Sequence, residues 1–254
     1  MIVKSYLDYA RGEQKISPWL VLAPLGWVAK ILVGLRNFAY DHGIAKSSAS
    51  PVPLVSIGNL TLGGTNKTPF VEMVALEIAR RGIPTGVVSR GYKGKARAPE
   101  LVNRLSEGAF AGDEPLLLQH RLKGLPVAVA NDRSAGIALL RLEEGVELVV
   151  ADDAFQHRKL RRDADIVLVD ALCPWGNGRL FPAGLLRESP AALERAEALR
   201  DRGHVGVELR DLRRVLRSEL LELRIARLAG DLTEAEPEVA LVLVGSRDRL
   251  RARA

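Results

Sequence analysis

The most informative part of the chain reads Gly58-Asn59-Leu60-Thr61-Leu62-Gly63-Gly64-Thr65-Asn66-Lys67-Thr68-Pro69. An apolar run over residues 52–57 precedes it, and apolar residues at helical spacing follow it from Phe70. A strand, a glycine-rich turn and a helix in this order form loops that wrap phosphate groups with backbone N–H groups at the helix N-terminus. We therefore predict that residues 58–69, the phosphate loop, bind the phosphates of a nucleotide.

The residue types in the phosphate loop predict individual roles. Lys67 is expected against the β- and γ-phosphates, and the Thr68 hydroxyl is expected to coordinate Mg²⁺. The strict pattern G-x-x-x-x-G-K-[ST] fails at both glycines, which are replaced by Thr61 and Asn66; after Gly, Asn best tolerates left-handed backbone. The alternative is a glycine-rich turn with an accidental Lys-Thr pair. The expected nucleotide contacts are Thr61, Leu62, Gly63, Gly64, Thr65, Asn66, Lys67 and Thr68.

Short apolar runs alternate with helical patterns beyond the phosphate loop. Besides 52–57, strands are predicted over 85–89, 126–130, 147–151 and 165–169, and 239–244 is a further candidate. Helices are predicted from Phe70 to the Arg80-Arg81-Gly82 stop, over 114–122 and over 134–142. This alternation predicts an α/β fold with a P-loop NTPase-like, mostly parallel sheet and helices on both faces.

Acidic residues flank two of these segments. Asp152 and Asp153 end the run 148–151, which would place a carboxylate at the carboxyl edge of the sheet, where it could hold Mg²⁺ directly or through water. Acids are also common turn residues. Asp113, in Gly112-Asp113-Glu114-Pro115, could accept a hydroxyl proton during phosphoryl transfer or could cap the helix that follows.

Two further segments could reach the same cleft. Gln156-His157-Arg158 follows the paired aspartates closely, but the role of His157 is not determined by the sequence. Arg90, in Ser89-Arg90-Gly91-Tyr92, follows a predicted strand, so it is either a phosphate contact or a solvated loop arginine.

The N-terminal region is strongly apolar. Residues 16–29 hold no charge, and after Lys30 the apolar run continues to Leu35, with Trp19 and Trp27 suited to a lipid interface. A spanning helix needs about 20 apolar residues, which this run reaches only by including Lys30 and Pro24. The open alternatives are an interfacial helix, a spanning helix and a buried core helix. No small-residue cleavage site follows, so no cleaved signal peptide is expected.

Composition limits the class of protein. With 47% hydrophobic and 27% charged residues, the 254-residue chain is neither collagenous, coiled-coil nor wholly disordered. A single cysteine, Cys173, excludes an intramolecular disulfide and favours a reducing compartment. The 37 Lys and Arg against 31 Asp and Glu give a charge of +6, which suits an anionic partner such as a nucleotide, a nucleic acid or an acidic lipid.

Taken in order, the segments resemble the tetraacyldisaccharide 4'-kinases, the lipid A 4'-kinases of Gram-negative bacteria. The resemblance extends from the apolar N-terminus to about Ala196. The matching segments are Val52-Pro53-Leu54-Val55-Ser56-Ile57-Gly58-Asn59 with its loop, Ser89-Arg90-Gly91-Tyr92, Gly112-Asp113-Glu114-Pro115, Asp152-Asp153-Ala154-Phe155-Gln156-His157, Asp165-Ile166-Val167-Leu168-Val169-Asp170, Gly176-Asn177-Gly178, Pro182-Ala183-Gly184 and Leu186-Arg187-Glu188.

The resemblance implies transfer of the γ-phosphate of ATP to the 4'-hydroxyl of a tetraacylated disaccharide 1-phosphate, giving lipid IVA. It further implies a need for Mg²⁺, a place on the cytoplasmic face of the inner membrane, and no nucleic-acid or protein partner. Lys67 and Asp113 become the expected catalytic residues, with Asp113 activating the sugar hydroxyl. The residues implied around the metal and phosphates are Asp152, Asp153, Gln156, His157 and Glu188, and those implied as metal ligands are Thr68, Asp152 and Glu188.

The chain departs from the family pattern at three points. Asn66 and Ala154 stand where glycines are usual, and no histidine-containing second lobe is recognisable after residue 196, because His204 has different surroundings. We expect this region to be truncated, frameshifted or diverged. The expected division is a membrane-associating segment over 1–45, a kinase core over 46–198 and a divergent region over 199–254.

Two other functions remain open at this point. A P-loop NTPase switch of the partitioning or metal-chaperone kind would account for the phosphate loop and Asp152, but not for the segments at Gly112 and Gly176. A nucleotide-binding remnant that has lost catalysis is the second. A non-enzymatic basic binding module would leave the phosphate loop unexplained.

Overall fold

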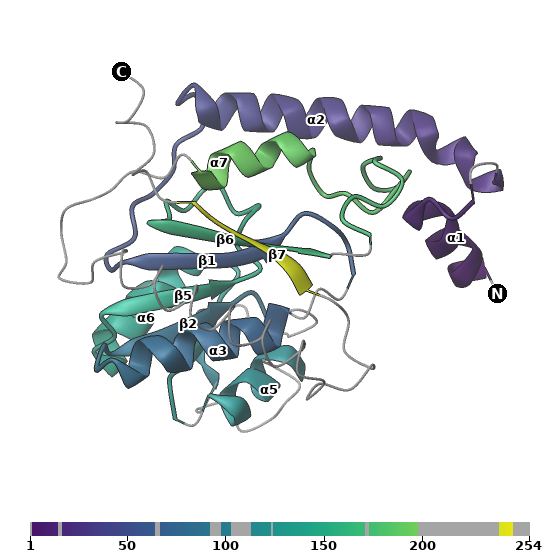
Figure 1. Ribbon diagram of the computed structural model, residues 1–254. Coiled ribbons are helices and arrows are strands. Elements are labelled where there is room, and N and C mark those ends of the chain that lie inside the picture. The colour runs from purple at the N-terminus through teal and green to yellow at the C-terminus, as the bar shows by residue number, and fades with distance from the viewer. Residues whose placement is uncertain are drawn as a thin grey trace, which may run out of the picture.

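The fold is seen in a computed structural model of the chain (Figure 1). It describes residues 2–14, 17–63, 67–91, 98–102, 113–122, 124–170, 173–197 and 239–245.

A seven-stranded sheet forms the centre of the described structure, in the order β3-β4-β2-β5-β1-β6-β7. Its inner strands are parallel, whereas the edge strands β3 and β7 are antiparallel to β4 and β6. Both neighbours of β1 come later in the chain, so the strand that leads into the phosphate loop lies inside the sheet. The strands are β1 Leu54–Asn59, β2 Thr85–Ser89, β3 Glu100–Leu101, β4 Val127–Val129, β5 Leu148–Asp152, β6 Ala164–Asp170 and β7 Val239–Gly245.

Helices cover both faces of the sheet, as the sequence predicts. Successive residues of a strand point to opposite faces: Val150 of β5 packs in a cluster with apolar residues of α3, whereas Val149 packs with Ile137 and Leu140 of α6. The helices are α1 Ile2–Arg11, α2 Ala23–Asp41, α3 Lys67–Arg80, α5 Asp113–Arg121, α6 Arg133–Glu144 and α7 Glu194–Glu197, with 3-10 turns at Pro18–Leu22 and Pro190–Leu193.

Most predicted strands are observed within two residues of their expected ends. Strand β1 begins and ends later than the predicted 52–57, because Gly58 and Asn59 still pair with β6. At Gly58 a Cβ would lie 2.6 Å from the Cβ of Phe155, so glycine allows this close approach. The two-residue β3 is too short for a periodic signal and was not predicted.

Helix α2 lies over the β6 side of the sheet (Figure 1). Here Leu60, Phe155 and Val167 form an apolar cluster against which Ala29 and Val33 of α2 pack. Gly26 is the only residue of α2 that is buried, so α2 is not the buried core helix that the sequence left open. By length and composition alone, the 24 residues Pro18–Asp41 could cross a membrane.

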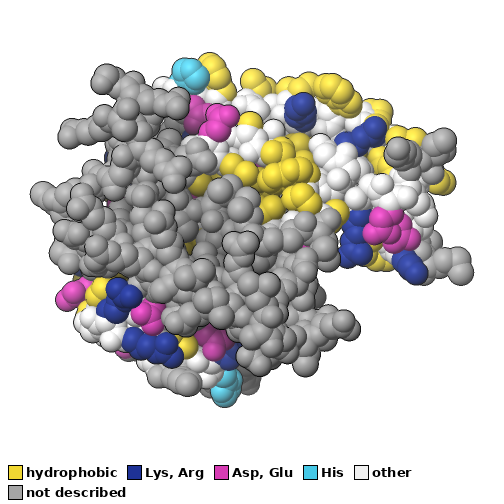
Figure 2. All heavy atoms as spheres, viewed as in Figure 1, with side chains coloured by type: hydrophobic (Ala, Val, Ile, Leu, Met, Phe, Trp, Pro, Cys, Tyr) yellow, Lys and Arg dark blue, Asp and Glu magenta, His cyan; other side chains and the backbone are white. Residues whose placement is uncertain are grey.

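The outer side of α2 is apolar and exposed. Figure 2 shows hydrophobic side chains gathered over this helix at the upper edge of the molecule. We call this surface the apolar face of α2. Its exposed members are Leu25, Trp27, Val28, Ile31, Leu32, Leu35 and Phe38.

The turn-rich segment 176–184 holds the N-terminal helices. The Asn177 backbone N–H donates to the Ala10 carbonyl at 2.8 Å, and the Tyr6 hydroxyl donates to the Pro182 carbonyl at 3.0 Å. At Gly176, whose φ is +56°, a Cβ would lie 2.4 Å from the Ala10 carbonyl oxygen. The Gly176-Asn177-Gly178 motif therefore forms the surface on which the end of α1 packs.

Two glycines of α2 provide a test of its docking. A Cβ at Gly26 would lie 2.6 Å from the Cβ of Ala183, whereas one at Gly34 would meet nothing within 4 Å. We expect Gly26→Ala to lower the free energy of unfolding by about 1–3 kcal/mol through overpacking. Gly34→Ala should be neutral or stabilising by up to about 1 kcal/mol, because alanine favours helix. Urea unfolding of both variants measures the difference, and equal stabilities would contradict this docking.

Candidate functional site

The phosphate loop lies between the carboxyl end of β1 and the first turn of α3. Strand β1 ends at Asn59 and α3 begins at Lys67. The Lys67 ammonium donates to Asn59 Oδ1 at 3.1 Å, so the two ends of the loop are joined. The predicted contacts Gly64, Thr65 and Asn66 lie outside the described residues.

A second segment fixes the first half of the loop. The Leu62 N–H donates to the Leu185 carbonyl, and the Arg187 N–H donates to the Leu60 carbonyl, both at 2.7 Å. Residues 185–187 therefore lie antiparallel to residues 60–62. This pairing brings the Leu186-Arg187-Glu188 motif next to the phosphate loop, although the two segments lie far apart in the sequence.

Asp153 is the centre of the charged groups at the mouth of the loop. Arg187 Nη1 donates to both carboxylate oxygens of Asp153 at 2.8 Å, and Lys67 Nζ lies 3.5 Å from Oδ1. Burial raises the pKa of Asp153, but Lys67, Arg187 and Arg133 outweigh it, so the net pKa lies below the usual range. The carboxylate is therefore charged at neutral pH and keeps the two flanking cations in place.

The backbone at Asp153 is held in an uncommon conformation. Its φ of +48° is in the left-handed region, and it is the only non-glycine residue of the described chain with a positive φ. Arg133, a buried residue at the start of α6, donates through Nη2 to the carbonyls of Asp152 and Asp153, at 3.0 Å in each case. These two hydrogen bonds fix the turn that carries the Asp152 and Asp153 carboxylates.

Asp152 and Thr68 carry side-chain oxygens of the kind that hard cations bind. Asp152 is buried at the end of β5, paired in register with Ile57 of the adjacent β1, and Thr68 lies in the first turn of α3. Within the described residues, no group of three or more His, Cys, Asp or Glu could hold a metal ion. Mg²⁺ bound to nucleotide phosphates needs only one or two carboxylates, since water and phosphate oxygens complete its octahedron. The donor set therefore fits Mg²⁺.

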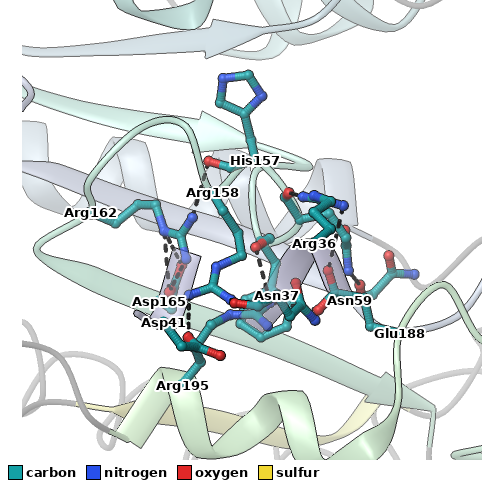
Figure 3. A network of polar contacts seen from close by, with 12 residues as sticks. Arg36, Asn37, Asp41, Asn59, His157, Arg158, Arg162, Asp165, Glu188 and Arg195 are labelled. Atoms are coloured by element: carbon teal, nitrogen blue, oxygen red, sulfur yellow. Dashed lines mark hydrogen bonds and ion pairs between the residues drawn. The ribbon is translucent and has the colours of Figure 1, made fainter. Parts of the chain in front are cut away.

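Glu188 lies among arginines. Its carboxylate is 1% exposed, with Oε2 2.7 Å from Arg195 Nη2 and Oε1 3.9 Å from Arg36 Nη1 (Figure 3). The guanidinium of Arg195 also lies 4.4 Å from the ring centre of Phe155. Of the three predicted metal ligands, Glu188 fits that role least well, because its described partners are cations.

Gln156 and His157 occupy the loop after β5. Gln156 Nε2 donates to the Asn59 carbonyl at 2.8 Å, at the start of the phosphate loop. The His157 imidazole points away from the arginines around Glu188 (Figure 3). Burial, with added repulsion from Arg133 and Arg162, lowers the pKa of His157 to about 4, so the ring is neutral at pH 7.

The structure leaves some predicted roles open and adds others. Asp113 is the first residue of α5, but its side chain lies outside the description, so its roles as base or cap stay predictions. Arg90 is exposed, at the end of β2. Sequence reasoning missed Arg133, Arg36 and Arg195. Only Arg133 left a signal, because it follows the predicted strand 126–130 at the same edge as the other site residues.

His157 provides a test of this environment by pH. We expect its imidazole to titrate near pH 4, followed by NMR of the ring protons and assigned with His157→Gln. Because the unfolded chain binds a proton below about pH 6.5 that the folded site rejects, stability should fall between about pH 6.5 and 4. His157→Gln should lessen that loss in urea unfolding. A midpoint near 6.5 would contradict the buried, cation-flanked environment.

Sequence and fold both relate this chain to one family of known proteins. The tetraacyldisaccharide-1-P 4'-kinase family matches residues 18–241 of the chain. A crystal structure described as the "apo" form of LpxK from Aquifex aeolicus in complex with ATP matches with 36% sequence identity and a TM-score of 0.66. The match covers 72% of this chain and 58% of that one, so the chain spans little more than half of that LpxK. The family match and the shared fold show that this chain belongs to the tetraacyldisaccharide-1-phosphate 4'-kinase family.

Proposed function

We propose that the protein transfers the γ-phosphate of ATP to the 4'-hydroxyl of a tetraacyldisaccharide 1-phosphate, forming lipid IVA. One observation carries this most directly: Lys67 and Arg187 converge on one carboxylate at the mouth of a strand–loop–helix turn. Cations gathered at the N-terminus of a helix form a site for phosphate groups. The ATP complex of the matched Aquifex LpxK supports the nucleotide.

The residues of the loop divide the work of phosphoryl transfer. Lys67 and Arg187 bind phosphate oxygens in place of the Asp153 carboxylate, which keeps both cations poised when no nucleotide is bound. Asp113 accepts the proton of the 4'-hydroxyl as its oxygen forms the bond to the γ-phosphorus, and the bond to the β-γ bridging oxygen breaks to release ADP. Thr68 and Asp152 would hold Mg²⁺, which supplies charge neutralisation at the phosphates. Glu188 is the weaker candidate for the same ion.

The reaction itself is the first test. Purified protein with Mg²⁺-ATP and the disaccharide 1-phosphate should give lipid IVA, detected by mass spectrometry. Phosphate release that does not depend on the lipid would favour the NTPase switch instead. Nucleotide binding with neither product would favour a catalytically impaired remnant. Such a remnant would keep the proposed membrane-associating segment 1–45 and kinase core 46–198, and its divergent region 199–254 would lack what catalysis needs.

Lys67→Ala should abolish formation of lipid IVA. The substitution removes the ammonium that lies 3.5 Å from Asp153 and 3.1 Å from Asn59. Loss of one such electrostatic contact to the transferring phosphate costs about a hundredfold or more in kcat. Arg81→Ala, just beyond the end of α3, is the matched control, because the Arg81 side chain pairs only with Glu77 in the described contacts. Turnover by Lys67→Ala equal to that of Arg81→Ala would remove the phosphate loop from the mechanism.

We also propose that the apolar face of α2 binds the cytoplasmic surface of the inner membrane. An acylated substrate stays in the bilayer, and a helix with one apolar face binds at the interface. The net charge of +6 favours anionic lipid. Of the arrangements that the sequence left open, an interfacial one satisfies this proposal, because α2 stays packed on the core through Ala29 and Val33.

A charge on the apolar face should weaken lipid binding. We expect Ile31→Glu to lower sedimentation with vesicles of phosphatidylglycerol and phosphatidylethanolamine severalfold, because Ile31 is 59% exposed on α2. Leu142→Glu is the control, since Leu142 is 82% exposed on α6. Equal sedimentation of the two variants would show that α2 is not the lipid-binding element.

A further inference from the structure

Polar residues in the C-terminal half of helix α2 contact the loop after β5. Arg36 Nη2 donates to the Gln156 carbonyl, and Arg36 Nη1 lies 3.9 Å from Glu188 Oε1. Figure 3 shows Arg36 reaching from α2 to the group that contains Asn59 and Glu188. One side chain of α2 therefore meets two segments of the candidate site.

A second set of contacts runs from Asn37 to Asp41, directly after Arg36 on α2. Arg158 Nη1 donates to the Asn37 carbonyl at 3.0 Å, and Arg158 Nη2 lies 2.5 Å from Asp41 Oδ1. The Arg158 guanidinium also lies 5.2 Å from the ring centre of Tyr40. The loop after β5 is thus held to α2 at both Gln156 and Arg158.

From these contacts, two short paths lead to the phosphate loop. Gln156 Nε2 donates to the Asn59 carbonyl at 2.8 Å, and Asn59 Oδ1 accepts from Lys67 at 3.1 Å. Along the second path, Glu188 directly follows Arg187, which binds Asp153 and whose N–H donates to Leu60. Arg36 is therefore separated from Lys67 and from Arg187 by one or two residues.

The buried negative charge of Glu188 stabilises the position of the Arg36 guanidinium beside it. A buried carboxylate is costly unless cations and hydrogen bonds compensate it. Arg195 satisfies Oε2, and Arg36 provides the second positive charge, on the Oε1 side. Without Arg36, the Gln156 carbonyl loses a charged donor and Glu188 loses part of its compensation, so both residues are held by fewer contacts.

We propose that Arg36 is a positioning residue of the nucleotide site: from α2, it holds Gln156 and Glu188 so that Lys67 and Arg187 are correctly placed for ATP. The inference rests on the proposed function for the identity of the nucleotide. Its consequence is that the helix that presents an apolar face to lipid also completes the geometry of the ATP site.

ATP binding to the full chain, purified in detergent micelles, tests the inference without any lipid substrate. We expect Arg36→Met to weaken the affinity for Mg²⁺-ATP about three- to tenfold in isothermal titration calorimetry, as the loss of one partly exposed hydrogen bond predicts. Arg36→Lys should recover part of the loss. Lys30→Met is the matched control, because Lys30 lies on the same helix with its ammonium 5.4 Å from the Trp27 ring centre.

A second variant and a stability measurement separate positioning from folding. Asp41→Asn breaks the ion pair with Arg158 at the exposed end of α2 and should weaken ATP binding in the same direction, by a smaller factor. Thermal unfolding is recorded for every variant. A lower melting temperature with unchanged ATP affinity in Arg36→Met would overturn the inference, because it would show a purely structural contact.

The failure of this inference can be distinguished from failure of the proposed function. If the unmodified protein does not bind ATP, the proposed function and the inference built on it both fail. If it binds ATP and Arg36→Met binds equally well, only the inference fails. Weaker binding by Arg36→Met and partial recovery by Arg36→Lys, with Lys30→Met unchanged, would support it.

Discussion

The site depends on the pairing of one carboxylate, Asp153, with cations from separate parts of the chain. Lys67 comes from the start of α3 and Arg187 from the segment that lies along the phosphate loop. Arg133, from α6, holds the Asp153 carbonyl. These groups are brought together only when the sheet is folded, and the positive φ of Asp153 is tolerated because this surrounding structure fixes it. The geometry at the mouth of the loop is thus a product of tertiary structure.

The sequence was sufficient for the parts of the fold that periodic patterns specify. Apolar strands and helices on both faces were predictable because their side chains repeat with periods of two and 3.6 residues. The phosphate loop was predictable because it has a local signature between a strand and a helix. Two contacts were not predictable from residue pattern, because each joins segments far apart in the chain. They are the packing of α1 on Gly176 and the pairing of residues 60–62 with 185–187.

The roles of two arginines, Arg36 and Arg195, could not be predicted from the sequence either. Arg36 lies in an apolar helix, where a lone cation resembles a solvated residue, and Arg195 follows a 3-10 turn with no motif of its own. Their significance comes from Glu188, whose burial requires cations that no sequence spacing identifies. Glu188, a predicted metal ligand, therefore lies in ion pairs with Arg36 and Arg195. These ion pairs give its carboxylate a structural role that needs no metal.

Helix α2 combines two kinds of surface. Its apolar face is exposed, whereas Arg36 and Asp41 of the same helix contact the loop after β5. If α2 binds lipid as we propose, the depth at which it enters the headgroups would also set the height of the candidate site above the bilayer, because the helix contacts that site. Such a site would lie near the headgroup level, where the sugar of the proposed substrate would reach it while the acyl chains stay in the membrane.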